Sequence, residues 1–171
     1  MRELTDAIRS IQDFPEPGVI FRDITTVLQD PDLLVTAVDA IADKLSGVDF
    51  DLVAGPESRG FIFAMPVAYK LRKGFVPVRK KGKLPYLTVQ KSYKLEYGSA
   101  VIEMHKDAIA EGQRVVVIDD LLATGGTCKA LAELVEEVGG VVASLVFLIE
   151  LEALNGREAL KGYNVQSVIR Y

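Results

Sequence analysis

Apolar residues in the second half of the chain form two kinds of pattern. Residues 115–118 and 141–149 are predominantly apolar runs, which is typical of central strands covered on both faces. Between these runs, apolar positions in 127–138 recur at helical spacing, and Gly139 and Gly140 follow as a stop. A strand–helix–strand unit of this kind requires a parallel crossover. The pattern therefore predicts an α/β protein with a mainly parallel central sheet flanked by helices.

The first half of the chain continues this alternation of helices and strands. Asp30 and Pro31 favour the start of a helix that reaches Leu45, and residues 60–73 have the spacing of a second helix. Short strands are expected over residues 50–54, 75–78 and 100–105. Residues 80–98 show no clear period, and we interpret them as a long loop or a hairpin arm.

The composition is that of a chain able to form a compact core. Hydrophobic residues make up 49% of the 171 positions, which favours one folded domain over residues 1–171. No apolar stretch approaches the roughly 18 residues of a membrane span. The first six residues include acids where a secretory signal has an apolar segment. One cysteine and one histidine provide neither an internal disulfide nor the usual zinc site. We therefore expect a soluble, cytoplasmic protein with no membrane partner.

The charges are distributed unevenly along the chain. The formal net charge is −4, but the window from residue 58 to residue 95 contains ten Lys and Arg and no Asp or Glu. The rest of the chain therefore carries a net charge of −14. A basic window of this kind is compatible with a nucleic acid, an anionic membrane, a small polyanion or a solvated face.

A glycine-rich segment follows the apolar run at 115–118. Gly125 and Gly126 allow the backbone N–H groups to curve around an anion, and Thr124 and Thr127 add hydroxyl donors. The start of the next helix also favours negative charge. The segment lacks the lysine of a P-loop and the glycine spacing of a dinucleotide-binding fingerprint. It is therefore interpreted as a site for a single phosphate group.

Asp119 and Asp120 stand between the apolar run and this segment. Two carboxylates would repel a polyphosphate, but they accept hydrogen bonds from sugar hydroxyls or bind a bridging cation. The combination predicts a site for ribose 5-phosphate, with a capped helix after a glycine-rich turn as the alternative. Cys128 follows at the helix start, where a thiol pKa can be lowered, although packing is the favoured interpretation.

Residues 119–127 resemble the phosphoribosyl-diphosphate signature of the type I phosphoribosyltransferase family. The resemblance extends along almost the whole chain, through residues 14–23, 57–61, 78–85, 95–98, 149–151 and 155–158, and it is closest to the adenine-specific members. It implies transfer of the phosphoribosyl group from 5-phosphoribosyl 1-diphosphate to adenine, which gives AMP and diphosphate. It also implies Mg²⁺ bound mainly through the sugar diphosphate, a homodimer, and no nucleic-acid partner. A transferase for another base and a non-catalytic sensor of the sugar diphosphate remain the alternatives.

The resemblance also implies a role for each matching residue. The 5′-phosphate is expected on Ala123, Thr124, Gly125, Gly126 and Thr127, and the ribose hydroxyls on Asp119 and Asp120. The diphosphate is expected on Glu57, Ser58, Arg59, Arg79, Lys80 and Lys83, with a cis peptide between the first two. Adenine is expected on Ile20, Phe21, Arg22 and Leu151. The expected catalytic residues are Glu96, which exchanges a proton with the purine ring, Arg59 and Tyr97. Residues 1–30 would form a base-binding segment, and residues 79–98 a mobile lid.

Overall fold

The computed structural model describes residues 4–94 and 98–171, so Glu96 and Tyr97 lie outside the described residues. The chain divides into two compact units, Met1–Ala40 and Ile41–Tyr171. Among the described residues, no helix combines the length and the apolar character that crossing a membrane requires.

The N-terminal unit contains short helices and a two-stranded antiparallel sheet. Its elements are α1 (Leu4–Ala7), β1 (Arg9–Gln12), β2 (Ile20–Asp23), α2 (Thr25–Gln29) and the first part of α3 (Pro31–Asp43). In the sheet, Ile11 lies opposite Phe21 and Arg9 lies opposite Asp23. The backbone N–H of Leu33 donates a hydrogen bond to Asp30 Oδ1 at 3.1 Å. The helix start expected at Asp30 and Pro31 is therefore confirmed.

The larger unit is built on a seven-stranded sheet with the strand order β5-β6-β4-β3-β7-β8-β9. Its strands are β3 (Leu52–Pro56), β4 (Gly74–Lys80), β5 (Thr88–Lys94), β6 (Ser99–His105), β7 (Arg114–Leu122), β8 (Val141–Glu150) and β9 (Val165–Arg170). The five strands from β4 to β9 in this order are parallel to one another, whereas β6 is antiparallel to both β4 and β5. The predicted fold class, α/β with a mainly parallel sheet, is confirmed.

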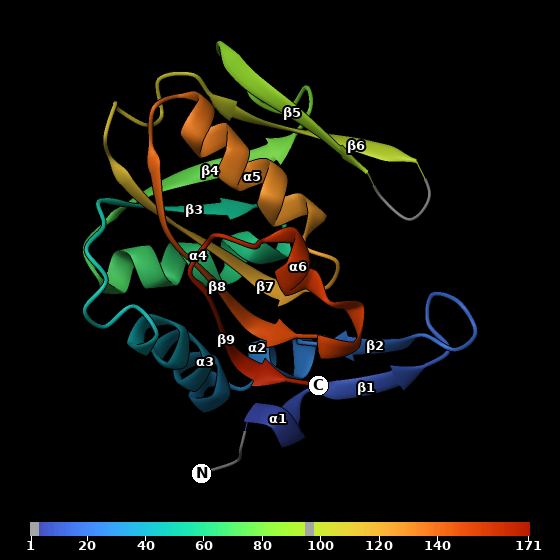
Figure 1. Ribbon diagram of the computed structural model, residues 1–171. Helices are drawn as coiled ribbons and strands as arrows, with labels where there is room; N and C mark the ends of the chain where they lie inside the picture. The colour runs from blue at the N-terminus through green and yellow to red at the C-terminus, as the bar shows by residue number, and fades with distance from the viewer. Residues whose placement is uncertain (1–3, 95–97) are drawn as a thin grey trace. The chain divides into compact units, whose positions relative to one another are not determined.

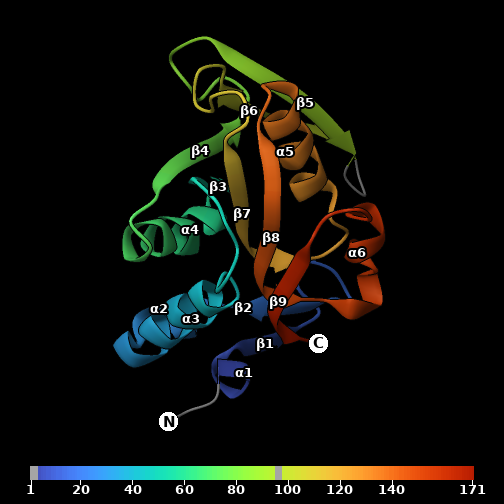
Figure 2. The ribbon, with the colours of Figure 1, turned by 60° about the vertical axis from the view of Figure 1, so that its left-hand side comes forward.

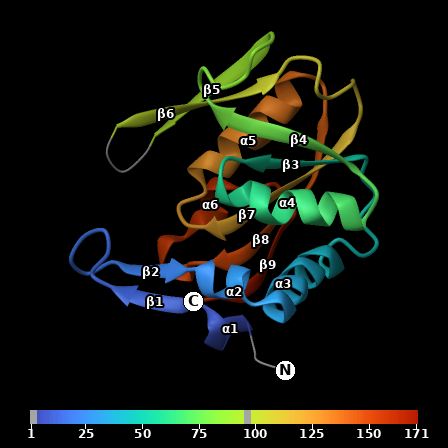
Figure 3. The same cartoon turned by 180° about the vertical axis from the view of Figure 1, so that it is seen from behind.

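Helices cover both faces of this sheet. Helix α5 (Gly126–Glu137) lies in front of the sheet in Figure 1, and α4 (Arg59–Lys70) lies in front of it in the opposite view of Figure 3. Figure 2 shows the sheet between these two helices. The central strand β7 is therefore covered on both sides, and its residues Val115–Ile118 are fully buried.

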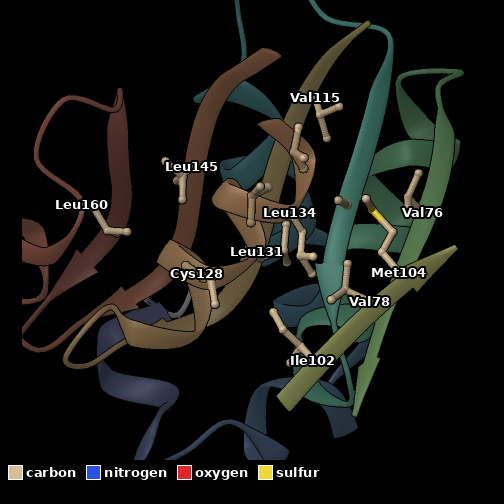
Figure 4. Close-up of a cluster of buried hydrophobic side chains, with 14 of the residues drawn as sticks. Val76, Val78, Ile102, Met104, Val115, Cys128, Leu131, Leu134, Leu145 and Leu160 are labelled. Carbon is tan, nitrogen blue, oxygen red and sulfur yellow. The ribbon is translucent and has the colours of Figure 1, made fainter. Parts of the chain in front are cut away.

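The main core lies between α5 and the sheet. Leu131 and Leu134 of α5 pack together with Val115 of β7, Leu145 of β8 and Met104 of β6 (Figure 4). The helix occupies this place because its apolar positions recur every three or four residues and so form one continuous face. The core fixes β7 and the N-terminus of α5, and therefore the seven residues 119–125 that join the apolar run to the helix.

Residues 80–98, which show no period in the sequence, contribute a strand. Strand β5 pairs with β6 over seven residues, from Thr88 opposite His105 to Lys94 opposite Ser99. Of the two interpretations offered by the sequence, the structure therefore supports the hairpin arm over the long loop. Lys91 of β5 forms an ion pair with Glu133 of α5 at 3.2 Å, so the hairpin also contacts α5.

The chain ends with short elements beyond β8. These are the 3₁₀ helix η1 (Glu152–Leu154), the short helix α6 (Gly156–Ala159) and the edge strand β9. Glu150, the last residue of β8, is 4% exposed. It accepts two hydrogen bonds from Arg157 of α6, at 2.6 Å from Nε and 2.8 Å from Nη2. This ion pair fixes α6 beside the end of β8.

Candidate active site

A cleft of about 350 Å³ opens where β3 and β7 end. These two strands are parallel, so their carboxyl ends lie on the same side of the sheet (Figure 1). Ligands of open α/β sheets bind at this edge. The residues that line the cleft are Pro56, Glu57, Ser58, Arg59, Lys80, Tyr93, Asp119, Asp120 and Thr127. Seven of these nine were expected at the site from the sequence, and they come from four separate segments of the chain.

The glycine-rich segment forms a second, smaller hollow of about 80 Å³, which shares Asp119 and Thr127 with the first. Gly125 is the residue before α5 and has a φ of +82°, a conformation that favours glycine. The backbone turns there so that the first N–H groups of the 12-residue helix α5 are free to bind an anion. All five residues expected at the 5′-phosphate, 123–127, line this hollow.

Helix α6 packs closely against the backbone of Ala123 and Gly125, which line this hollow. A Cβ atom added at Gly125 would lie 2.6 Å from the carbonyl oxygen of Gly156, and one added at Gly156 would lie 2.2 Å from that of Ala123. Two backbone segments are therefore in direct contact at a distance that no larger side chain allows. The Arg157–Glu150 ion pair holds the second of these segments in place. Sequence reasoning placed neither Gly156 nor Arg157 at the phosphate loop.

The two aspartates at the end of β7 have different surroundings. Asp119 Oδ1 accepts a hydrogen bond from the backbone N–H of Asp120 at 2.9 Å. Burial raises the pKa of Asp119 well above its ordinary value, and the negative charge of Asp120 raises it further. Asp120 is only 4% exposed, and its Oδ2 lies 2.9 Å from Arg59 Nε. Burial also raises the pKa of Asp120, although the positive charge of Arg59 opposes this effect.

Arg59 thus connects the two halves of the cleft. It is the first residue of α4 and directly follows Ser58, and the Glu57–Ser58 peptide bond is cis, as expected from the sequence. The ion pair between Arg59 and Asp120 spans 61 positions of the chain, and sequence reasoning did not predict it. The positive end of the α4 dipole does not favour a cation at this position. The carboxylate of Asp120 offsets this effect by pairing with the Arg59 guanidinium group.

Arg79 and Glu57 form a second ion pair beside the cleft, with Nε 2.8 Å from Oε2. Nη1 of Arg79 also donates a hydrogen bond to the carbonyl oxygen of Lys83 at 3.3 Å. The expected diphosphate residues therefore lie close together, although of the three basic residues 79, 80 and 83 only Lys80 lines the cleft itself. Tyr93 of β5 also lines it, and sequence reasoning missed this tyrosine because residues 80–98 had no recognisable period.

The residues expected at the base lie in both units. In the N-terminal unit, Ile20, Phe21 and Arg22 belong to β2, and the ring of Phe21 contacts that of Phe14 edge to face at 5.2 Å. In the larger unit, Leu151 precedes η1, and its N–H donates a hydrogen bond to the carbonyl oxygen of Leu122 at 3.0 Å. Leu151 is therefore tied to the last residue of β7, just before the phosphate loop.

Cys128 lies behind Asp119, and its thiol donates a hydrogen bond to Oδ2 at 3.8 Å. Burial raises the pKa of this thiol well above its ordinary value, and the negative charge of Asp119 adds to the effect. Cys128 is also part of the main core (Figure 4). The packing role favoured by the sequence is confirmed, and a lowered thiol pKa at this helix start is wrong.

Comparisons with known proteins match the whole chain. A family model described as a phosphoribosyl transferase domain matches residues 25–169. An adenine phosphoribosyltransferase of Lachnoclostridium phytofermentans is 60% identical over 171 residues, covering 100% of this chain and 98% of the relative.

Solved structures agree with this match. The crystal structure of an adenine phosphoribosyltransferase from Thermoanaerobacter pseudethanolicus superposes with a TM-score of 0.96 at 53% identity, covering 98% of each chain. A second adenine phosphoribosyltransferase structure, from Saccharomyces cerevisiae, has a TM-score of 0.91 at 37% identity and covers 96% of each chain. That protein was crystallised with adenine and an imino-altritol bisphosphate.

Proposed function

The chain belongs to the adenine phosphoribosyltransferase family, and we propose that it transfers the phosphoribosyl group of 5-phosphoribosyl 1-diphosphate to adenine. The C1′–N9 bond forms, adenine loses the proton of its imidazole ring, the bond from C1′ to the diphosphate oxygen breaks, and the products are AMP and diphosphate. The observation that carries the proposal is the pairing of Asp119 and Asp120 with a phosphate-sized hollow at the end of β7. Such a site suits a phosphorylated sugar.

The 5′-phosphate would occupy the hollow of residues 123–127, where backbone N–H groups and threonine hydroxyls donate hydrogen bonds. Asp119 and Asp120 would accept hydrogen bonds from the ribose hydroxyls. Since Asp120 already pairs with Arg59, the same guanidinium group can link the ribose site to the diphosphate. Sugar and leaving group would then be held in one fixed geometry, which lowers the entropic part of the barrier.

The diphosphate would lie on the other side of the cleft, against residues 57–59 and the basic residues Arg79, Lys80 and Lys83. Negative charge builds up on the diphosphate as the bond to C1′ breaks, and cationic groups aimed at it stabilise the transition state. This assignment explains part of the acid-free window between residues 58 and 95. A planar guanidinium group such as that of Arg59 is well suited to bind phosphate oxygens in pairs.

The donor atoms of the cleft fit Mg²⁺ held mainly by the substrate. In residues 4–94 and 98–171, no group of three or more His, Cys, Asp or Glu side chains is arranged to hold a metal ion. Mg²⁺ in phosphate sites is bound by one or two carboxylates together with substrate oxygens. Asp119 and Asp120 supply such carboxylates. When bound, the ion would neutralise charge on the sugar diphosphate.

The family resemblance assigns the two faces of adenine to Phe21 and Leu151, and its polar edge to the backbone of Ile20 and Arg22. An aromatic ring and an aliphatic side chain suit the two faces of a purine. This part of the proposal is carried by the family membership and by the matching motifs.

Glu96 and Tyr97 lie outside the described residues, and their catalytic roles rest on the motif alone. A positioned carboxyl group can exchange a proton with the purine ring and so activate N9. Glu96→Ala is then expected to lower kcat by about 100-fold or more and to leave the Kd of the sugar diphosphate nearly unchanged. Single-turnover kinetics and calorimetry measure the two quantities, and an unchanged kcat would contradict the role of Glu96.

We also infer a homodimer and a cytoplasmic location, both from the family resemblance. Met65 and Tyr69 lie one turn apart on α4, and both side chains are exposed, Tyr69 to 84%. Exposed apolar side chains that share one helix face are typical of a surface that binds another protein.

A panel of bases tests the function as a whole. Purified protein is mixed with Mg²⁺, 5-phosphoribosyl 1-diphosphate and adenine, hypoxanthine, guanine or uracil in parallel, and nucleotide formation is followed by chromatography. AMP from adenine alone is the expected result. Product from a different base would assign another transferase activity, and no product from any base would favour a non-catalytic sensor.

A further inference from the structure

Glu103 is a buried acid at the centre of the antiparallel part of the sheet. It lies on β6, is 2% exposed, and stands in register opposite Arg79 of β4 and Gln90 of β5. Burying a carboxylate is costly unless hydrogen bonds or charges compensate for the lost water. The buried carboxylate of Glu103 must therefore be stabilised by specific partners.

The hydrogen bonds of Glu103 fix the turn that follows β4. Its Oε1 accepts from the backbone N–H groups of Lys83 at 2.8 Å and Leu84 at 2.9 Å, and its Oε2 accepts from Gln90 Nε2 at 3.2 Å. Burial raises the pKa of Glu103, but these hydrogen bonds, led by that from Leu84, outweigh it and bring the pKa below its ordinary value. Glu103 is therefore a charged acceptor at neutral pH.

A series of contacts leads from this turn to the cleft. The carbonyl oxygen of Lys83 accepts a hydrogen bond from Arg79 Nη1, and Arg79 Nε pairs with Glu57 Oε2 at 2.8 Å. Glu57 lines the cleft, and its own N–H donates to the carbonyl oxygen of Val78 at 2.9 Å. The backbone of Lys83 is thus held from both sides, by Glu103 at its N–H and by Arg79 at its carbonyl oxygen.

We propose that Glu103 is a positioning residue for the anion-binding side of the cleft. By holding the turn at 82–84, it fixes the backbone of Lys83, and through it the orientation of Arg79 and Glu57. The proposal rests on the proposed function in one respect, namely that the anion is the diphosphate of the substrate. Glu103 itself does not contact the substrate.

The neighbouring glutamine allows a test that separates positioning from packing. Glu103→Gln keeps the shape of the side chain but replaces charge-assisted hydrogen bonds by neutral ones, which are roughly half as strong. Its new amide group also faces the amide of Gln90. In the double variant Glu103→Gln with Gln90→Glu, the carboxylate stands on the neighbouring strand. The amide introduced on β6 can then donate to that carboxylate while its oxygen accepts from the turn. Glu137→Gln, on the exposed end of α5, is the matched control.

Binding of inorganic diphosphate with Mg²⁺, measured by calorimetry, is the main readout, because it does not depend on which base reacts. Glu103→Gln is expected to raise the Kd by about ten-fold, with a similar rise in KM for the sugar diphosphate and little change in KM for adenine. The double variant regains the contact between positions 103 and 90 but keeps a neutral acceptor at the turn, so its Kd is expected to recover only in part, by about two- to three-fold. Glu137→Gln is expected to bind as the wild type does.

The proposal is wrong if Glu103→Gln binds diphosphate as tightly as the wild type does, or if the double variant binds it more weakly than the single one. Gln90→Leu covers the case in which Glu103→Gln does not fold, because Gln90 is exposed and its replacement spares the turn contacts. It is expected to weaken binding by about three-fold, and wild-type binding would count against the proposal. Failure of the wild type to form AMP would refute the proposed function but leave the diphosphate measurement valid.

Discussion

The contact between Gly156 and the phosphate loop gives a quantitative prediction. A Cβ atom at position 156 would lie 2.2 Å from the carbonyl oxygen of Ala123 and 2.8 Å from Cδ1 of Leu122. Close contacts between carbon and oxygen are normally about 3.3 Å or longer. Gly156→Ala must therefore move the loop carbonyl, or α6 itself, by about 1 Å. Because backbone stands on both sides of the contact, a change of rotamer cannot relieve it.

Gly156→Ala is expected to affect both the stability of the protein and its reaction rate. Overpacking of this kind destabilises a protein by about 1–3 kcal/mol. A displacement of about 1 Å at a positioned substrate group can also lower the rate by about 100-fold. Gly156→Ala is therefore expected to lower the free energy of unfolding and to raise KM for the sugar diphosphate by about ten-fold or more.

Gly162→Ala is the matched control. Gly162 has a φ of +100°, and a Cβ atom there would meet nothing within 4 Å. The variant is expected to lose about 1–2 kcal/mol of stability through backbone strain without any contact with the phosphate loop. Urea unfolding and steady-state kinetics on both variants give the two quantities. If Gly156→Ala bound the sugar diphosphate as tightly as the control, the inferred role of the Gly156–Ala123 contact in shaping the phosphate loop would be refuted.

Two further predictions concern ionisable groups. Glu150 has a pKa held below its ordinary value of 4.5, first by the hydrogen bonds from Arg157, so its contribution to stability is present above pH 4.5 and is lost as the pH falls through the lowered pKa. Glu150→Gln is therefore expected to be less stable than the wild type by about 2 kcal/mol at pH 7, and a gap in urea unfolding that failed to narrow below pH 4 would contradict this. The buried Cys128 thiol has a raised pKa, so iodoacetamide at pH 8 is expected to alkylate it only after unfolding, and rapid labelling of the native protein, detected by mass spectrometry, would show the opposite.

The elements that the sequence predicts well are those with a strong apolar period. Strand β7 and helix α5 follow directly from the run at 115–118 and from helical spacing after it, and each observed boundary lies within a few residues of the expected one. Strand β5 is not recognisable from the sequence because residues 91–94 are Lys-Ser-Tyr-Lys on a half-exposed strand, and they show no alternation of apolar and polar residues. Strand β9 is short, and the polar residues Gln166 and Ser167 interrupt its apolar pattern.

The candidate site shows the same division. The residues at the end of β7 could be predicted because strand, aspartates and glycines are contiguous in the chain. The Arg59–Asp120 ion pair, the hydrogen bonds of Glu103 and the contact of Gly156 with Ala123 each join segments that are distant in sequence. Local pattern carries no information about such pairs, because they depend on strand order and register.

A crystal structure of the protein with AMP tests the central assignment most directly. We expect the 5′-phosphate on the backbone N–H groups of residues 123–127, within about 3.2 Å, and the ribose hydroxyls on Asp119 and Asp120. Arg59 is expected to remain beside the ribose site. A phosphate bound elsewhere, for example against Arg79 and Lys80, with the hollow at 123–127 filled by solvent, would contradict it.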